Sequence, residues 1–318
     1  MAIKFKTDGN PIEVKPSKEI KSMEKYIVWH IEGGLGKNVA ATALLPALAK
    51  KHQDRKIVVV ASYPEIFLNN PHIYRVYAVG NAPYFYDDYI YQKDTIVYKH
   101  EPYFQTDHIL KKKHVIQNWA DLLGLEVKNP KPQLYPNMVQ KNFRFTWQRQ
   151  KPVLLIQTAG GLFSGQTIGY AWTRDMPLEY ANWIVQEYSK DYHIIQITRE
   201  GAPTLEGVEV INQPMTNHEL FSIIEASAKR VLIDSSLQHA AAAYGKKSVV
   251  LWVGTSPENF GYDMHTNIKA QPPKGNTKLI DSYFFDADFT GRPHECPYDD
   301  VNEMFNLDQL KKAINKTN

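Results

Sequence analysis

A strand–helix alternation that occurs twice along the chain constrains the fold more than any other feature. In the first half, the strand-like run 26–31 is followed by a glycine turn, a helical pattern over 39–51 and a second apolar run at 57–61. Continuous apolar runs of this kind are typical of parallel strands that are covered on both faces. Strand, turn, helix and strand make a βαβ unit, so the sequence predicts a parallel sheet in this half.

A proline-rich stretch separates this half from a second alternation. Residues 128–137 have the most linker-like composition of the chain, and its length suits about two domains. We therefore expect an extension at 1–24, a first domain at 25–148 and a second domain at 149–318. In the second domain, the predicted strands are 153–156, 193–197, 230–233 and 248–252, and the predicted helices are 178–189, 218–228, 238–244 and 307–314.

The fold class that follows is α/β, with two Rossmann-like, doubly wound domains facing a central cleft. Such sheets bind their ligands beyond the carboxyl ends of the strands. Functional residues are therefore expected in the segments that directly follow the predicted strands.

The overall composition argues against several other classes of protein. The net charge is +3 and the pI is near 8.6, which tolerates an anionic ligand but lies below the pI of a basic nucleic-acid-binding domain. The single cysteine, Cys296, cannot form an internal disulfide, and no apolar stretch approaches the roughly 18 residues of a membrane span. The N-terminus lacks the apolar core of a signal peptide. We expect a soluble, cytoplasmic protein.

The segment from Asp234 to Thr255 carries the strongest local signal of a binding site. A predicted strand ends at Ile233 and brings Asp234 and Ser235 to the carboxyl edge of the sheet. Ser235 or Ser236 could cap the next helix. The first-turn amides and the dipole of such a helix favour an anion.

Two further groups reach the same edge of this sheet. His239 lies near the start of the predicted helix, and the next strand leads into a turn at Gly254 and Thr255. Taken alone, Asp234 could merely cap a helix and His239 could be an interior histidine. Their arrival at one sheet edge, beside a second glycine turn, favours an anion-binding site over these two structural interpretations.

The same segment resembles the nucleotide-sugar-binding signature of glycosyltransferase family 9, the ADP-heptose:lipopolysaccharide heptosyltransferases. The family pattern is Asp-Ser-Gly, a few residues, His-x-Ala-Ala-Ala and then a strand that ends in a Gly-Pro-Thr turn. This sequence departs from the pattern at Ser236, which replaces the glycine, and in the turn 253–256, which lacks the family's proline position. The matching residues are Asp234, Ser235, His239, the alanines 240–243, Gly254 and Thr255.

The resemblance extends, less closely, over roughly 26–60 and 150–258, and it implies a GT-B fold whose second domain binds the nucleotide-sugar. Trp172-Thr173 is similar to the tryptophan-proline pair that begins a family helix. The family's lysine just ahead of that tryptophan is missing, so Arg174 or Arg199 would supply the positive charge. The donor-binding residues that we expect are Thr158, Gly160, Gly161, Arg174, Thr198, Arg199, Asp234, Ser235, His239, Gly254 and Thr255.

The glycine loop after the first predicted strand is not a Walker A motif, because Ile31 stands where the first glycine belongs and Asn38 replaces Ser or Thr. It resembles the family's opening Gly-Asp loop, with Lys37 in place of the aspartate that the family uses as catalytic base. Glu32, at the same strand end, is the replacement base that we expect; alternatively, Lys37 acts electrostatically and the base lies elsewhere. The glycines also suit a plain tight turn. The acceptor side of the site is expected at Gly34, Gly36 and Asn38.

Metal binding is not expected, and neither is a cofactor besides the donor substrate. Asp286-Ala287-Asp288 matches the Asp-x-Asp motif of GT-A glycosyltransferases, but such a pair supplies too few oxygen ligands by itself. A surface loop is the favoured interpretation. The histidines show no zinc-ligand spacing with the lone cysteine.

The sequence thus predicts a glycosyltransferase that moves a sugar from a nucleotide-diphosphate sugar to a hydroxyl acceptor, with inversion and without a metal. The acceptor could be a glycan or, as an alternative, a modified nucleic-acid base. Two other functions stay open. One is a sugar-nucleotide epimerase of the same architecture; the other is a non-catalytic nucleotide-sugar-binding protein, which the missing aspartate and lysine favour.

Overall fold

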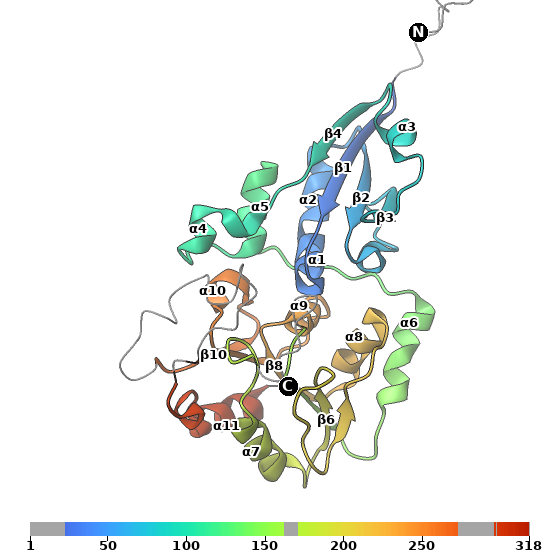
Figure 1. Ribbon diagram of the computed structural model, residues 1–318. Helices are drawn as coiled ribbons and strands as arrows, with labels where there is room; N and C mark the ends of the chain where they lie inside the picture. Colours follow the sequence, from blue (N-terminus) through green and yellow to red (C-terminus); the bar gives the residue numbers. More distant parts are fainter. Residues whose placement is uncertain (1–22, 162–170, 273–295, 297, 318) are drawn as a thin grey trace, which may run out of the picture.

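The computed structural model describes residues 23–161, 171–272, 296 and 298–317. Two parallel β-sheets form the frame of the molecule, one before and one after the proline-rich stretch (Figure 1). The expected extension at 1–24 lies almost entirely outside the described residues, as does Asp286-Ala287-Asp288. Within the described part of the chain, no helix is long and apolar enough to cross a membrane.

In the part of the chain that the structure describes, the first sheet has four parallel strands in the order β3-β2-β1-β4. In β1, Ile27, Trp29 and Ile31 pack into one apolar core, whereas Tyr26 and Val28 pack into another on the opposite face. Successive side chains of a strand point to opposite faces, so this continuous apolar run is buried on both sides, as predicted. The strands are β1 (Lys25–Ile31), β2 (Lys56–Ala61), β3 (Arg75–Ala78) and β4 (Asp94–Tyr98).

The helix predicted at 39–51 was wrong in one respect, because the structure has two helices there with a 3-10 turn between them. The first helix begins earlier, at Leu35, and Pro46 stands in the first turn of the second, where its missing amide is tolerated. Because the apolar spacing continues through this break, the sequence did not reveal that the helix is interrupted. The helices of this half are α1 (Leu35–Ala41), α2 (Leu45–Lys51), α3 (Phe85–Tyr89), α4 (Thr106–Ile109), α5 (Val115–Leu123) and α6 (Met138–Asn142), and the 3-10 turns are η1 (Thr42–Leu44), η2 (Pro64–Phe67), η3 (Pro102–Phe104) and η4 (Phe143–Trp147).

Within the described residues, the second sheet has six parallel strands in the order β10-β9-β8-β5-β6-β7. Its four central strands are those that the sequence predicted. The outer strands β7 and β10 were not predicted; they are short and partly polar, as edge strands usually are. The strands are β5 (Val153–Gln157), β6 (His193–Ile197), β7 (Glu209–Ile211), β8 (Lys229–Ile233), β9 (Val249–Trp252) and β10 (Thr266–Lys269).

Helices cover both faces of the second sheet, which confirms the doubly wound arrangement. Tyr180 and Ile184 of α7 share a core with Leu310 of α11 on one face. Phe221 of α8 and Leu237 of α9 pack on the other face. The helices of this half are α7 (Leu178–Tyr188), α8 (Asn217–Ala226), α9 (Ser236–Ala243), α10 (Pro257–Phe260) and α11 (Leu307–Lys316), with the 3-10 turn η6 (Val301–Glu303).

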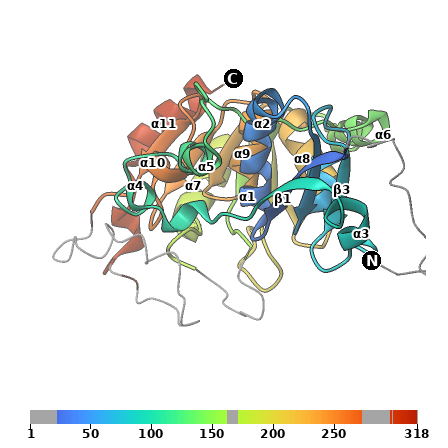
Figure 2. The same ribbon diagram turned by 90° about the horizontal axis from the view of Figure 1, so that it is seen from above.

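The two halves meet where α1 packs against α9 (Figures 1 and 2). Val39 and Ala40 of α1 belong to the same apolar cluster as Ala240 and Ala241 of α9. The sheets fall on either side of residue 148. The domain boundaries themselves, 25–148 and 149–318, stay a prediction.

Candidate functional site

Each sheet has one position where the order of its strands reverses along the chain. In the first sheet, the chain passes from β1 to β2 and then to β3 on one side of β1, and β4 then pairs with the other side of β1. In the second sheet, the reversal lies between β5 and β8. Open α/β sheets bind ligands beyond the carboxyl ends of the strands at such a switch point. The candidate site therefore comprises the segments after β1, β4, β5 and β8, which are 32–38, 99–103, 158–161 and 234–239.

The two switch points face one another across the contact between α1 and α9. A Cβ atom added at Gly36 would lie 3.0 Å from Cδ2 of His239 and 3.4 Å from Cα of Ser236. Glycine at position 36 thus lets the first turns of both helices approach this closely. The structure brings together Gly36 and His239, which the sequence assigned to the acceptor and donor sides.

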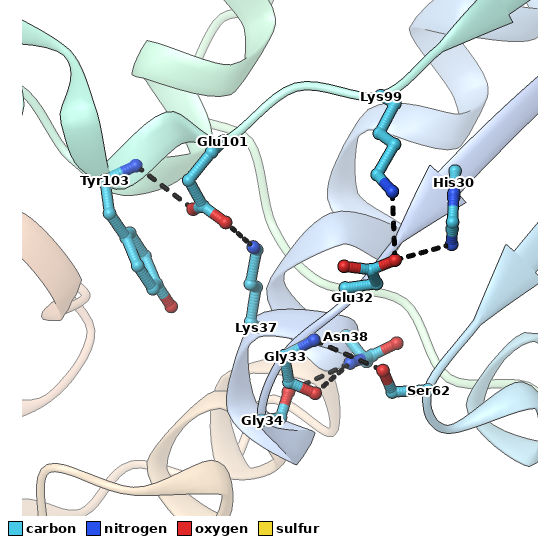
Figure 3. A network of polar contacts seen from close by, with 10 residues as sticks. All are labelled: His30, Glu32, Gly33, Gly34, Lys37, Asn38, Ser62, Lys99, Glu101 and Tyr103. Carbon is cyan, nitrogen blue, oxygen red and sulfur yellow. Dashed lines mark hydrogen bonds and ion pairs between the residues drawn. The ribbon is translucent and has the colours of Figure 1, made fainter. Parts of the chain in front are cut away.

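The glycine loop is held by hydrogen bonds from within the first half (Figure 3). Gly33 has a φ of +109°, a conformation that favours glycine, and its amide donates to Ser62 Oγ at 3.2 Å. The side-chain amide of buried Asn38 donates to the carbonyls of Gly33 (3.2 Å) and Gly34 (2.9 Å). Asn38 therefore shapes the loop, and its contact with an acceptor stays a prediction.

Lys37 is a buried cation with a carboxylate partner that the sequence did not single out. Its side chain is 5% exposed, and its Nζ lies 2.5 Å from Oε2 of Glu101, which is 38% exposed (Figure 3). The ammonium also lies over the rings of Tyr103 (5.2 Å) and Trp119 (5.5 Å). A buried charge needs such partners. The usable signal for Glu101 was its place directly after β4, which becomes informative once β4 is known to pair with β1.

Glu32 lies on the other side of the same switch point. Its side chain is 51% exposed, and Oε1 lies 3.1 Å from Lys99 Nζ and 3.1 Å from His30 Nε2. The hydrogen bond from Lys99 holds the pKa of the Glu32 carboxyl below its usual range. Figure 3 shows the Glu32 and Glu101 carboxylates engaged with separate partners. Glu32 as catalytic base stays a prediction.

Ser235 is the N-cap of α9, as predicted. Its Oγ accepts a hydrogen bond from the Leu237 amide (3.2 Å) and donates to Gln157 Oε1 (2.6 Å). Gln157 is the last residue of β5, so this bond joins the end of β5 to the segment after β8 at the second switch point. Asp234, just before it, is buried.

His239 is buried at the contact between the halves. Its Nδ1 is hydrogen-bonded to Tyr262 Oη at 2.7 Å. Burial, with smaller contributions from His114 and His265, lowers the pKa of His239 to about 3. The ring is therefore neutral near pH 7, and any contact with a diphosphate would be a hydrogen bond rather than an ion pair. Its role in donor binding stays a prediction.

The loop after β5 is fixed by an ion pair that the sequence did not reveal. Arg199 contacts both carboxylate oxygens of buried Asp175, at 2.7 and 3.0 Å, and donates to the Gly160 carbonyl at 3.2 Å. Asp175 also accepts from the amides of Gly160 (3.3 Å) and Ala171 (2.8 Å). Arg199 thus carries its positive charge next to the predicted donor loop while it holds that loop in place.

Two predicted donor-binding residues, Thr158 and Gly254, have defined packing roles. Thr158 Oγ1 accepts from Gln196 Nε2 at 2.6 Å. The amide of Gly254 donates to the Thr173 carbonyl at 2.7 Å, and a Cβ at Gly254 would lie 2.9 Å from Thr173. Glycine is thus needed at 254 for the turn to pack on the 171–174 segment, which includes half-buried Arg174.

Two other predicted donor-binding residues carry hydroxyl groups that lack a partner within the described part of the chain. Oγ1 of Thr198 and Oγ1 of Thr255 are buried, and neither has a hydrogen-bond partner among the residues that the structure describes. Buried polar atoms normally have a partner. These hydroxyls lie after β6 and β9, the neighbours of the switch-point strands. A ligand bound there could therefore provide their hydrogen-bond partners.

The described ranges contain no group of three His, Cys, Asp or Glu side chains placed to hold a metal ion. The Asp286-Ala287-Asp288 pair falls outside them. The expectation of a metal-free site therefore stays a prediction.

No protein-family model and no curated protein matches this sequence. Solved structures do match in fold. The ADP-heptose lipopolysaccharide heptosyltransferase II of E. coli is 13% identical, with 91% of this chain and 98% of that chain covered and a TM-score of 0.59. The family 9 glycosyltransferase of Veillonella parvula is 13% identical, with 77% and 85% covered and a TM-score of 0.57.

A third match is the iron-containing dodecameric glycosyltransferase TibC of enterotoxigenic E. coli. It is 16% identical, with 92% of this chain and 76% of that chain covered and a TM-score of 0.65. A second TibC structure, in complex with ADP-D-β-D-heptose, has a TM-score of 0.64. At this level of identity the likeness is one of fold, and it confirms the predicted α/β, GT-B type of architecture.

Proposed function

We propose that this chain is a glycosyltransferase that moves a sugar from a nucleotide-diphosphate sugar to a hydroxyl acceptor. One observation carries the proposal: the switch points of two parallel sheets face each other, with a capped helix N-terminus on one and the Lys37–Glu101 pair on the other. Two opposed switch points offer one site for a donor and one for an acceptor. The single cysteine suits the reducing cytoplasm, where we place the protein.

The donor would bind at the second sheet. Ser235 caps the N-terminus of α9, whose first-turn amides and dipole favour a diphosphate. The amides of Gly160 and Gly254 already have acceptors. We therefore assign the diphosphate to the Gly161 amide, the first turn of α9 that Ser235 caps, and the Thr255 hydroxyl.

The other donor-side residues would surround this diphosphate. Arg199 and Arg174 would supply positive charge, the first from its fixed place beside the donor loop. Asp234 would orient the sugar or ribose, and the Thr198 hydroxyl, which has no hydrogen-bond partner among the described residues, would gain one from the nucleoside. His239 would donate or accept as a neutral ring, while Thr158 supports the loop from behind.

ADP-sugars are the first donors to test, because the fold matches include an ADP-heptose transferase and a TibC complex with ADP-D-β-D-heptose. A glycan hydroxyl is the acceptor class that we propose. Helix amides and arginines would stabilise the leaving diphosphate without a metal, and a single direct displacement would invert the anomeric carbon.

Thermal-shift measurements with ADP-, GDP- and UDP-sugars test donor binding. A true donor at a hundredfold excess over its dissociation constant stabilises the fold by about 2.7 kcal/mol. Ser235→Ala should weaken donor binding at least tenfold, whereas the lost cap lowers stability by only about 1 kcal/mol. Mass spectrometry of reactions with a panel of glycan acceptors, with and without EDTA, then detects transfer.

The outcomes separate the candidate functions. No stabilisation by any nucleotide-sugar contradicts the proposal. A changed sugar in the absence of acceptor identifies an epimerase, and donor binding without transfer or hydrolysis identifies a binding protein. Transfer that EDTA abolishes and a divalent cation restores contradicts the metal-free mechanism.

A further inference from the structure

Transfer to a hydroxyl group needs a base that takes the hydroxyl proton, and the base must lie on the acceptor side within hydrogen-bond reach. Two carboxylates occupy the switch point of the first sheet, Glu32 after β1 and Glu101 after β4. We infer that Glu101 is the general base and that Lys37 positions it; this inference rests on the proposed glycosyltransferase function.

The first argument is where the two carboxylates lie relative to the second half. The ring of Tyr103, two residues after Glu101, packs on Phe260 of α10 with ring centroids 5.8 Å apart. The carbonyl of Phe260 in turn accepts a hydrogen bond at 3.0 Å from Nε2 of Gln238, the neighbour of His239 in α9. The Glu101 segment therefore borders the donor side.

Glu32 has no comparable connection among the described residues. Its partners Lys99 and His30 both belong to the first half, and they lie away from the Lys37–Glu101 pair in Figure 3. An exposed ion pair of this kind also fixes a side chain poorly.

The second argument is how firmly Glu101 is held. Oε2 accepts from the buried ammonium of Lys37, whose position is set by the Tyr103 and Trp119 rings. Among the described residues, Oε1 accepts one long hydrogen bond, 3.4 Å, from the Tyr103 amide, and over a third of the side chain is exposed. One oxygen is thus anchored, and the other can receive an acceptor hydroxyl.

The step that follows is balanced without any further reactant. The acceptor O–H gives its proton to Glu101 Oε1, and the oxygen forms a bond to the anomeric carbon. The bond from that carbon to the diphosphate oxygen breaks, and its electron pair leaves with the nucleoside diphosphate. Glu101 later returns the proton to solvent, while Lys37 stays charged throughout.

Glu101→Gln keeps the size and the hydrogen-bonding shape of the side chain but cannot take a proton at this pH. We expect transfer to fall about 10²- to 10⁴-fold, with the donor dissociation constant unchanged within about twofold. The acid limb of the kcat/KM pH profile should disappear. Glu126→Gln, the same change at an exposed site away from the switch points, is the matched control and should behave as wild type.

Lys37→Gln tests the positioning role. Loss of the ammonium removes the anchor of Glu101 Oε2, so kcat should fall while KM for the donor stays unchanged. A purely structural role for Lys37 would lower stability but leave kcat close to that of the wild type at a temperature where both proteins are folded. Glu101→Asp, which keeps the carboxylate, should recover part of the rate lost in Glu101→Gln.

The rival candidate for the base is Glu32, so Glu32→Gln is measured beside Glu101→Gln. If Glu32→Gln causes the larger loss and removes the acid limb, or if Glu101→Gln transfers as wild type does, the inference is overturned while the glycosyltransferase function stands. If the wild-type protein transfers no sugar from any donor, the proposed function itself fails. Should Glu101→Gln melt well below wild type, Glu101→Ala with added formate decides, because restored transfer requires a missing base.

Discussion

At the residue scale, buried histidines determine how the stability of this protein depends on pH. His108, His239 and His265 are buried, and burial is the main cause that lowers their pKa values to about 4, about 3 and about 4. An unfolded histidine has a pKa near 6.5. Below that pH the unfolded chain binds protons that the folded chain does not, so the stability contributed by neutral burial is complete above pH ~6.5 and is lost as pH falls towards ~4.

We predict that the free energy of unfolding falls by about 1.4 kcal/mol per pH unit for each of these histidines between pH ~6 and ~4.5. Urea unfolding across this range measures the slope. His239→Gln, which keeps a neutral polar side chain, should make the slope shallower by about one proton. A slope equal to that of the wild type would show that His239 already titrates normally in the folded protein.

At the element scale, the sequence predicted most clearly those strands whose side chains are buried on both faces, and it gave a weaker signal at 96–98, within the half-exposed β4. The central strands β1, β2, β5, β6, β8 and β9 carry continuous apolar runs and were recognised. The edge strands β3, β7 and β10 are half-exposed and short, so their composition resembles that of loops. Burial pattern, rather than strand propensity, therefore decided what could be predicted.

The candidate site was predictable where it follows a recognised strand, and not where it depends on pairing between distant segments. Asp234 and Ser235 directly follow β8, and Ser235 caps α9 as predicted. Glu101 contacts Lys37 across 64 positions of sequence, and Asp175 contacts Arg199 across 24. No local pattern in the sequence indicates that the members of such a pair meet. The order of the strands in the sheets brings them together.

The close approach of α1 and α9 makes a specific prediction for the glycine loop. Gly36→Ala would place a Cβ 3.0 Å from His239, so we expect it to lower the free energy of unfolding by about 1–3 kcal/mol, despite the better helix propensity of alanine. At Gly34, no described atom lies within 4 Å of an added Cβ, and φ is −67°.

Gly34→Ala is therefore the matched control and should change stability by less than about 0.5 kcal/mol. Urea unfolding of both variants compares them directly. Equal effects of the two substitutions would mean that the contact between α1 and α9 adjusts to the added methyl group without a loss of stability. That contact would then not position the two halves.

At the scale of the whole molecule, the two sheets share more than a linker. One apolar cluster contains Ile27 of β1 and Leu155 of β5, with α1 and α9 between the halves. Polar contacts also cross between them: Asn259 Nδ2 donates to the His108 carbonyl at 2.8 Å, and Asn217 hydrogen-bonds to Glu65. A core that is continuous across both sheets should couple their unfolding.

We predict a single cooperative thermal transition, in which the calorimetric and van't Hoff enthalpies agree, because neither half can lose its packing without exposing apolar surface of the other. Differential scanning calorimetry measures both enthalpies. Asn259→Ala, which removes the buried hydrogen bond to the His108 carbonyl, should lower Tm without splitting the peak, since the apolar cluster remains. Two resolved transitions, or a van't Hoff enthalpy near half the calorimetric value, would instead mean that the regions 25–148 and 149–318 unfold independently, and that the contact between α1 and α9 joins two self-sufficient domains.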